Sequence, residues 1–118
     1  MAVARKAGVA KSQMILDPGI GFGKSFAQNY EILQKLPQLA KLGFPLLVGT
    51  SRKGFLGATL ARDGRAAPPE DRIWGTAATV TSSILHGAHI VRVHDVAEMI
   101  QVARVADCLI DPKHTPRN

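Results

Sequence analysis

The sequence is poor in several residue types, and each scarcity excludes a class of protein. Cys108 is the single cysteine in 118 residues, which excludes an internal disulfide and a cysteine-rich metal site. The aromatic residues, four Phe, one Trp and one Tyr, are not interleaved with basic residues as a base-stacking nucleic-acid surface requires. No apolar run approaches the roughly 20 residues that a membrane span needs. These absences leave a soluble globular domain as the expected class.

Acidic residues are also scarce, nine against fifteen basic ones, so the formal net charge is +6. We interpret this charge as suited to a phosphate-bearing small molecule, and a basic nucleic-acid module is the least favoured alternative. The first residues contain no apolar core of a secretory signal. Together with the lone cysteine, this predicts a cytoplasmic protein.

Strand and helix signals alternate along the whole chain. After a helix end over residues 5–11, we predict strands at residues 14–17, 45–49 and 90–94. The predicted helical segments are residues 29–41 with a break at Pro37, a short turn at 56–60 capped by Ser51, a helix from Pro69 to Gly87, and a last helix opened by a capping box of Asp95 and Glu98. Repeated strand–helix units predict an α/β fold with parallel strands.

Two of these helices carry apolar residues at helical spacing, which predicts the faces that they bury. The set in the helix before Gly87 is Ile73, Ala77, Val80 and Ile84. The set in the last helix is Met99, Val102, Ala106 and Leu109.

Each predicted strand ends in polar or ionisable side chains. Asp17 ends the first strand, Ser51-Arg52-Lys53 follows the second, and Arg92 and His94 lie on the third. Because the carboxyl ends of parallel strands meet at one edge of a sheet, we expect a single active-site rim. Arg92 and His94 are two residues apart and face the same side, which favours binding of an anion such as diphosphate over a structural role.

Residues 19–25 form a glycine-rich loop that fits neither standard phosphate motif. A P-loop needs glycine at position 18, which is Pro18, and a dinucleotide fingerprint needs glycine at position 24, which is Lys24. What remains is a backbone that permits close approach of a ligand, with Phe22 able to stack on a flat ring.

Two of these features have a second, structural interpretation. Asp17 either accepts hydrogen bonds from the adjacent N–H groups of a planar ligand or starts an Asp-Pro-Gly turn, and on local grounds the turn is favoured. The Ser51-Arg52-Lys53 turn either binds an anion or is a capped basic turn facing solvent.

Taken together, the motifs resemble those of dihydropteroate synthase in order and spacing. They are Asp17-Pro-Gly-x-Gly-Phe-Gly-Lys24, Gly49-x-Ser-Arg-Lys53-x-Phe-Leu-Gly57, Gly75-Thr-Ala-Ala78 and Arg92-Val-His-Asp-Val96. The resemblance covers essentially the whole chain. It implies a transferase of folate biosynthesis that joins 6-hydroxymethyl-7,8-dihydropterin diphosphate to p-aminobenzoate and releases diphosphate. The pterin-binding domain of a folate-dependent methyltransferase is an alternative that the Ser-Arg-Lys and Arg-Val-His-Asp runs disfavour.

The resemblance also implies a role for each matching residue. Asp17, Phe22, Gly49 and Lys53 would bind the pterin, and Ser51 with Arg52 would receive the carboxylate of p-aminobenzoate. Arg92 and His94 would bind the diphosphate, and Lys53, Arg92 and His94 would be the catalytic residues.

Length sets the remaining expectations. A (β/α)8 TIM barrel needs about 250 residues, so we expect residues 1–118 to be a C-terminal part of a pterin-binding domain, about the last three βα units plus a preceding helix. The Mg²⁺ that the resemblance implies would have its protein ligand in the N-terminal half, and we predict no metal ligand in this chain. The expected partners are the two substrates, with turnover needing a second copy or a complementing N-terminal half. A pterin-binding fragment without turnover is the alternative.

Overall fold

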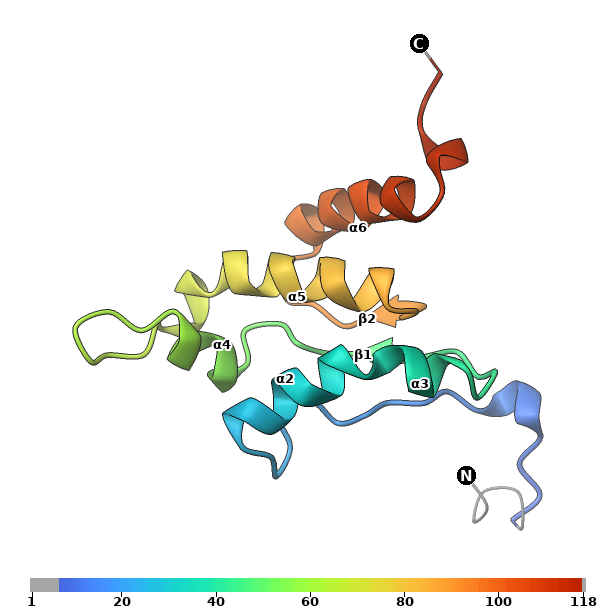
Figure 1. Cartoon of the computed structure of the whole chain (residues 1–118), viewed down its shortest axis with the longest axis horizontal. Coiled ribbons are helices and arrows are strands. Elements are labelled where there is room, and N and C mark those ends of the chain that lie inside the picture. The colour runs from blue at the N-terminus through green and yellow to red at the C-terminus, as the bar shows by residue number, and fades with distance from the viewer. Residues whose placement is uncertain (1–6, 118) are drawn as a thin grey trace.

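The structure is a computed structural model that describes residues 7–117, with helices packed on one face of a short parallel sheet (Figure 1). The α-helices are α2 (Phe26–Gln34), α3 (Leu36–Ala40), α4 (Gly54–Thr59), α5 (Ile73–Leu85) and α6 (Val96–Ile110). The strands are β1 (Leu47–Val48) and β2 (Ile90–Val91), and the 3-10 turns are η1 (Lys11–Gln13), η2 (Pro69–Asp71) and η3 (Pro112–His114). The fold class is therefore α/β, as predicted.

The sheet joins the three predicted strand regions in parallel, but its ladders are shorter than predicted. β1 pairs with β2 in the register Leu47↔Ile90 and Val48↔Val91. Of the strand predicted at residues 14–17, only a parallel bridge between Leu16 and Leu46 forms. Within residues 7–117, both outer segments have a hydrogen-bonding neighbour on one side only.

The predicted break at Pro37 is confirmed, because α2 ends at Gln34 and α3 begins at Leu36. The helix starts earlier than predicted, at Phe26, where Ser25 and Gln28 form a reciprocal capping box. The sequence predicts a helix end at residues 5–11. Residues 5 and 6 lie outside the described part, residues 7–10 are not helical, and Lys11 begins the 3-10 turn η1.

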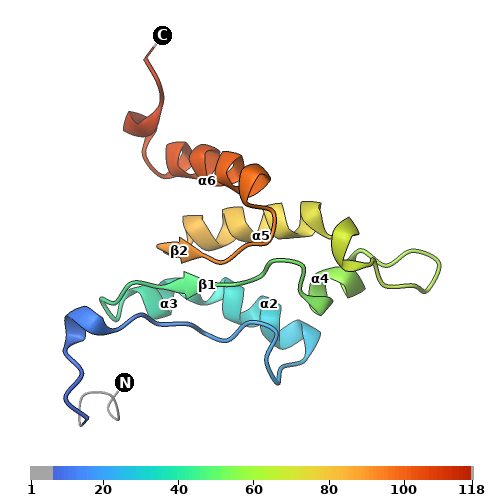
Figure 2. The ribbon, with the colours of Figure 1, turned by 180° about the vertical axis from the view of Figure 1, so that it is seen from behind.

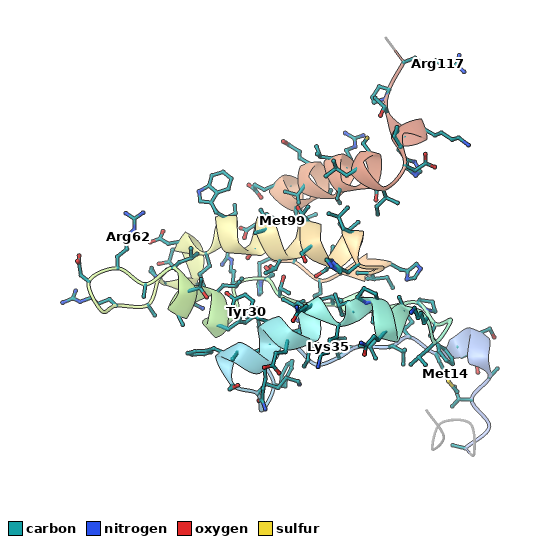
Figure 3. All side chains as sticks on the ribbon, viewed as in Figure 1. Met14, Tyr30, Lys35, Arg62, Met99 and Arg117 are labelled. Carbon is teal, nitrogen blue, oxygen red and sulfur yellow. The ribbon has the colours of Figure 1, made fainter. Side chains whose placement is uncertain are left out.

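The core lies between the parallel segments and the helices on one face of them. Leu46 and Val48 are fully buried against α2 and α3, and Val91 packs with Val80 of α5. Met99 lies between α6 and α5 (Figure 3). The predicted buried face of α5 is confirmed, and so are Met99, Val102 and Ala106 of α6. The prediction for Leu109 is wrong, because this residue is 63% exposed in the last turn of α6.

The opposite face of the parallel segments carries no helix among residues 7–117. Seen from behind, the segments lie in front of α2, α3 and α5 (Figure 2). Apolar side chains on this face, Ile15 and Ile90, are exposed. The described part is flat, 51 × 47 × 22 Å, and its radius of gyration of 15.8 Å exceeds the about 13–14 Å of a compact domain of this size. Within residues 7–117 no helix is long and apolar enough to cross a bilayer.

Candidate functional site

A cleft of about 440 Å³ lies at the carboxyl ends of the three parallel segments. All eight residues singled out from the sequence line it, although they come from three separate parts of the chain. The full lining is Asp17, Ile20, Phe22, Leu47, Gly49, Ser51, Arg52, Lys53, Pro69, Arg92, Val93 and His94. The predicted single rim is therefore present as a shared cleft, and its cationic side chains outnumber the one carboxylate.

The glycine-rich loop forms one wall of the cleft and is held by side chains from within and behind it. Lys24 Nζ donates to the carbonyl oxygens of Gly19 at 2.7 Å and Phe22 at 3.0 Å. Gly21 has a φ of +87°, and a Cβ at this position would lie 2.9 Å from Lys53 Cδ. A larger residue at position 21 would therefore strain the backbone and displace Lys53.

Asn29 supports this loop and was not among the predicted site residues. Its side chain is 2% exposed, Oδ1 accepts a hydrogen bond from the Gly21 N–H at 2.8 Å, and Nδ2 donates to the Ser25 carbonyl at 3.1 Å. Asn29 lies in the same helical stripe as Leu33 and Leu36, which are buried. A polar residue in an apolar stripe is the sequence signal that could have identified it.

Asp17 starts a turn and also has a carboxylate that lines the cleft, so both interpretations of this residue agree with the structure. Oδ1 accepts a hydrogen bond from the Gly19 N–H at 2.8 Å, as an Asp-Pro-Gly turn predicts. The carboxylate is nevertheless exposed and lines the cleft. Because a carboxylate has about four acceptor sites, the turn leaves most of them available to a ligand.

Phe22 and Lys53 meet across the mouth of the cleft. Lys53 Nζ lies 4.4 Å from the centroid of the Phe22 ring, a cation–π geometry, and the ring is 67% exposed. The two side chains thus present a flat apolar surface and a positive charge side by side, which suits a planar polar ring.

Ser51 does not cap the helical turn, contrary to the prediction. α4 begins at Gly54, with Lys53 in the N-cap position. The Ser51 side chain is buried, and its Oγ lies 2.8 Å from His94 Nδ1 and accepts a hydrogen bond from the His94 backbone N–H at 3.0 Å. Ser51 therefore bonds to His94, 43 residues away and brought close by the pairing of β1 and β2, instead of to the start of the nearby helical turn.

Arg52 forms a bidentate ion pair with Asp95, with Nη2 at 2.8 Å from Oδ1 and Nε at 3.3 Å from Oδ2. The predicted capping box is wrong, because the Asp95 side chain makes no capping hydrogen bond to α6. The hydrogen bond from Arg52 lowers the pKa of Asp95, an effect that desolvation opposes. The same hydrogen bond raises the pKa of Arg52. The pair stays charged across the physiological range.

The backbone of Arg52 adopts a left-handed conformation, with a φ of +57°, which costs about 1–3 kcal/mol for a residue other than glycine. Two partners from the α5 region hold it there. Its N–H donates to Thr76 Oγ1 at 3.1 Å, and its carbonyl accepts a hydrogen bond from Arg72 Nη1 at 2.7 Å. Sequence reasoning singled out neither Thr76 nor Arg72 as supports of the site.

Arg92 and His94 lie at the end of β2, on the side of the cleft opposite the glycine-rich loop, and both are exposed. Gly49 lies beside Arg92, and a Cβ at Gly49 would stand 3.7 Å from Arg92 Cβ. The absence of a side chain at position 49 keeps the floor of the cleft open between the two walls.

The resemblance also implies a metal ion, which would need oxygen or nitrogen ligands gathered at one place. Among the residues that the structure describes, no three His, Cys, Asp or Glu side chains gather as a metal site would require. These residues do not fit a protein-held Mg²⁺.

The chain is similar in sequence and structure to several known proteins. A curated dihydropteroate synthase of Synechocystis sp. is 53% identical over 107 residues, covering 91% of this chain and 36% of the relative. A crystal structure of dihydropteroate synthase from Clostridium difficile in the presence of pteroic acid is 45% identical with a TM-score of 0.84, covering 92% of this chain and 39% of that one. That of Yersinia pestis with a pterine-sulfa conjugate is 39% identical with a TM-score of 0.85, covering 92% and 40%.

The chain thus spans well under half the length of the proteins that it matches. The family model described as "Pterin binding enzyme" matches residues 1–94, which is most of the chain. The chain therefore belongs to the family of pterin-binding enzymes.

Proposed function

We propose that this chain provides the pterin and diphosphate side of a dihydropteroate synthase active site. The observation that carries the proposal is the convergence of Asp17, Lys53 and Arg92, from three different strand ends, on one cleft. The ligands named for the neighbours, pteroic acid and a pterine-sulfa conjugate, are of the class that such a cleft would accept.

The pterin would lie between the glycine-rich loop and the floor of the cleft. Asp17 offers acceptor sites to the N–H edge of the ring, and the Phe22 ring offers a stacking surface. Lys53 donates to ring acceptors from the same side, and Gly49 leaves room for the ring. The 2.8 Å bond from the Gly19 N–H orients the carboxylate of Asp17 before the ligand arrives, which lowers the entropic cost of binding.

The reaction breaks the C–O bond at the pterin methylene carbon, and the electron pair leaves with the diphosphate. The amine of p-aminobenzoate then forms the C–N bond and loses a proton. We assign stabilisation of the departing anion to Arg92, His94 and Lys53, because positive charge and hydrogen-bond donors at the leaving oxygen lower the barrier. These three are the catalytic residues of the proposal.

The Ser51–Arg52 turn would receive the carboxylate of p-aminobenzoate. Asp95 binds Nε and Nη2 of Arg52, and within residues 7–117 Nη1 makes no hydrogen bond, so this edge of the guanidinium can bind an anion. The available geometry therefore supports Arg52 more directly than Ser51 in this role.

We also propose that residues 1–118 form the C-terminal part of a pterin-binding domain, as the last three βα units and a preceding helix of a (β/α)8 barrel. Parallel segments covered by helices on one face alone support this arrangement, since the inner face of barrel strands packs on the other strands. The occupant of the bare face would then be a complementing barrel half. The cytoplasmic location stays a prediction.

Calorimetric titration of the full chain with a pterin diphosphate and, separately, with inorganic diphosphate tests the proposal. Asp17→Asn keeps an oxygen for the Gly19 N–H but loses the charge, so pterin affinity should fall about 10- to 150-fold, the equivalent of a charge-assisted hydrogen bond of about 1.5–3 kcal/mol. Binding of inorganic diphosphate should change little in this variant.

Asp107→Asn, which makes the same charge change on α6 away from the cleft, is the matched control and should retain pterin affinity. Absence of pterin binding, or equal losses in the two variants, would refute the proposal. Turnover measured with and without a complementing barrel half separates a synthase from a fragment that only binds pterin.

A further inference from the structure

The hydroxyl of Ser51 is enclosed, and both of its hydrogen-bonding partners belong to His94. Ser51 is 3% exposed. Its Oγ lies 2.8 Å from the ring nitrogen Nδ1 and 3.0 Å from the backbone nitrogen of the same histidine. Among the hydrogen bonds formed within residues 7–117, these are the only two that Ser51 Oγ makes. A serine hydroxyl has one proton to donate and two lone pairs to accept with.

Counting the protons decides the direction of the 2.8 Å bond. The backbone N–H can only donate, so Oγ accepts in the 3.0 Å bond. If Nδ1–H also donated to Oγ, the hydroxyl proton would be left without an acceptor among residues 7–117, on a residue that is only 3% exposed, which is unfavourable. If the hydroxyl donates to Nδ1, then Ser51 Oγ, His94 Nδ1 and the His94 backbone N–H each have a hydrogen-bonding partner.

Among residues 7–117, no carboxylate forms a hydrogen bond with the ring of His94. Asp95 is the adjacent carboxylate, and both of its oxygens bind Arg52. The second ring nitrogen, Nε2, is then the one that carries the proton, on a side chain that lines the cleft.

We propose that Ser51 is a positioning residue that holds neutral His94 with its ring proton on Nε2. His94 thereby presents a hydrogen-bond donor to the cleft without first taking up a proton. The use of this donor by a departing diphosphate rests on the proposed function, whereas the tautomer itself does not. Since the hydroxyl proton of Ser51 is committed to Nδ1, it cannot also be donated to the carboxylate of p-aminobenzoate.

Another histidine of the same chain provides an internal reference. His86 Nδ1 lies 2.6 Å from the backbone carbonyl oxygen of Ser82, which can only accept, so neutral His86 must carry its proton on Nδ1. The two histidines are therefore expected to be opposite tautomers in a single sample.

Nitrogen-15 NMR of the histidine rings of the full chain tests the proposal, at a pH well above the ordinary imidazole pKa of about 6.5. His94 should show a protonated Nε2 and an unprotonated Nδ1, and His86 the reverse. In Ser51→Ala the Nδ1–H form of His94 should rise several-fold over its wild-type level, and Ser51→Thr, which keeps the hydroxyl, should restore the wild-type pattern.

Ser82→Ala is the matched control and should leave the tautomer of His94 unchanged. A protonated Nδ1 on wild-type His94 would overturn the proposal without any variant having to fold. An identical His94 pattern in wild type and Ser51→Ala would overturn it as well. Addition of inorganic diphosphate then tests the proposed function separately: an unmoved Nε2 signal would remove the diphosphate role of His94 and leave the tautomer assignment standing.

Discussion

Replacing Asn29 by alanine should destabilise the protein far more than its position in a helix predicts. The change removes the hydrogen bond from the Gly21 N–H and the one to the Ser25 carbonyl. At about 1 kcal/mol for each bond, and up to about 1 kcal/mol more for the partly buried amide left unpaired, the free energy of unfolding should fall by about 2–3 kcal/mol. Alanine is the best helix former, so helix propensity works in the opposite direction.

Urea unfolding at equilibrium measures this loss as a shift in midpoint at an unchanged m-value. Gln34→Ala, at an exposed position of the same helix, is the matched control and should change stability by less than about 0.5 kcal/mol. Hydrogen exchange of the Gly21 amide should accelerate selectively in the Asn29 variant. Equal stability of the two variants, or an unchanged exchange rate at Gly21, would refute the reasoning.

Two further predictions concern the ion pair and the glycines of α4. Because the pKa of Asp95 is lowered in the folded state by Arg52, the pair stabilises the fold above the ordinary carboxyl value of 3.8, and this contribution is lost as the pH falls below it. The difference in melting temperature between wild type and Asp95→Asn should therefore shrink on acidification, and a difference independent of pH would contradict this. Gly57→Ala should lower stability by about 1–3 kcal/mol, because its Cβ would lie 2.8 Å from the carbonyl oxygen of Ala67. Gly54→Ala, with open space at the same helix, should be neutral or stabilising, and similar losses in both would count against the steric argument.

The location of the site could be predicted from the sequence because it depends on a rule of topology. Polar residues that end parallel strands gather at one edge wherever the helices lie, so Asp17, Ser51 and Arg92 could be grouped without knowing any distance. The lengths of the strands could not be predicted in the same way, because the extent of a ladder depends on a partner segment that lies far away in the sequence. The segment at residues 14–17 forms a single bridge, between Leu16 and Leu46.

The two helix-capping predictions failed because a distant side-chain partner competes with the local helix end. Ser51 and Asp95 are both good capping residues, and the sequence shows only their immediate neighbours. In the fold each finds a partner 43 residues away, His94 for Ser51 and Arg52 for Asp95. Capping propensity describes a helix end in isolation, and a stronger side-chain pair overrides it.

These two contacts also bear on the order in which the protein folds. Ser51 with His94 and Arg52 with Asp95 close the same loop, which contains α4, the segment before α5, and α5 itself. Closing a loop of this length costs entropy before any contact repays it, so neither pair can form early on its own. Both pairs need β1 and β2 side by side, because they join the chain just after β1 to the chain just after β2. We therefore expect the cleft to be assembled late in folding, so that variants of either pair accelerate unfolding and leave the folding rate nearly unchanged.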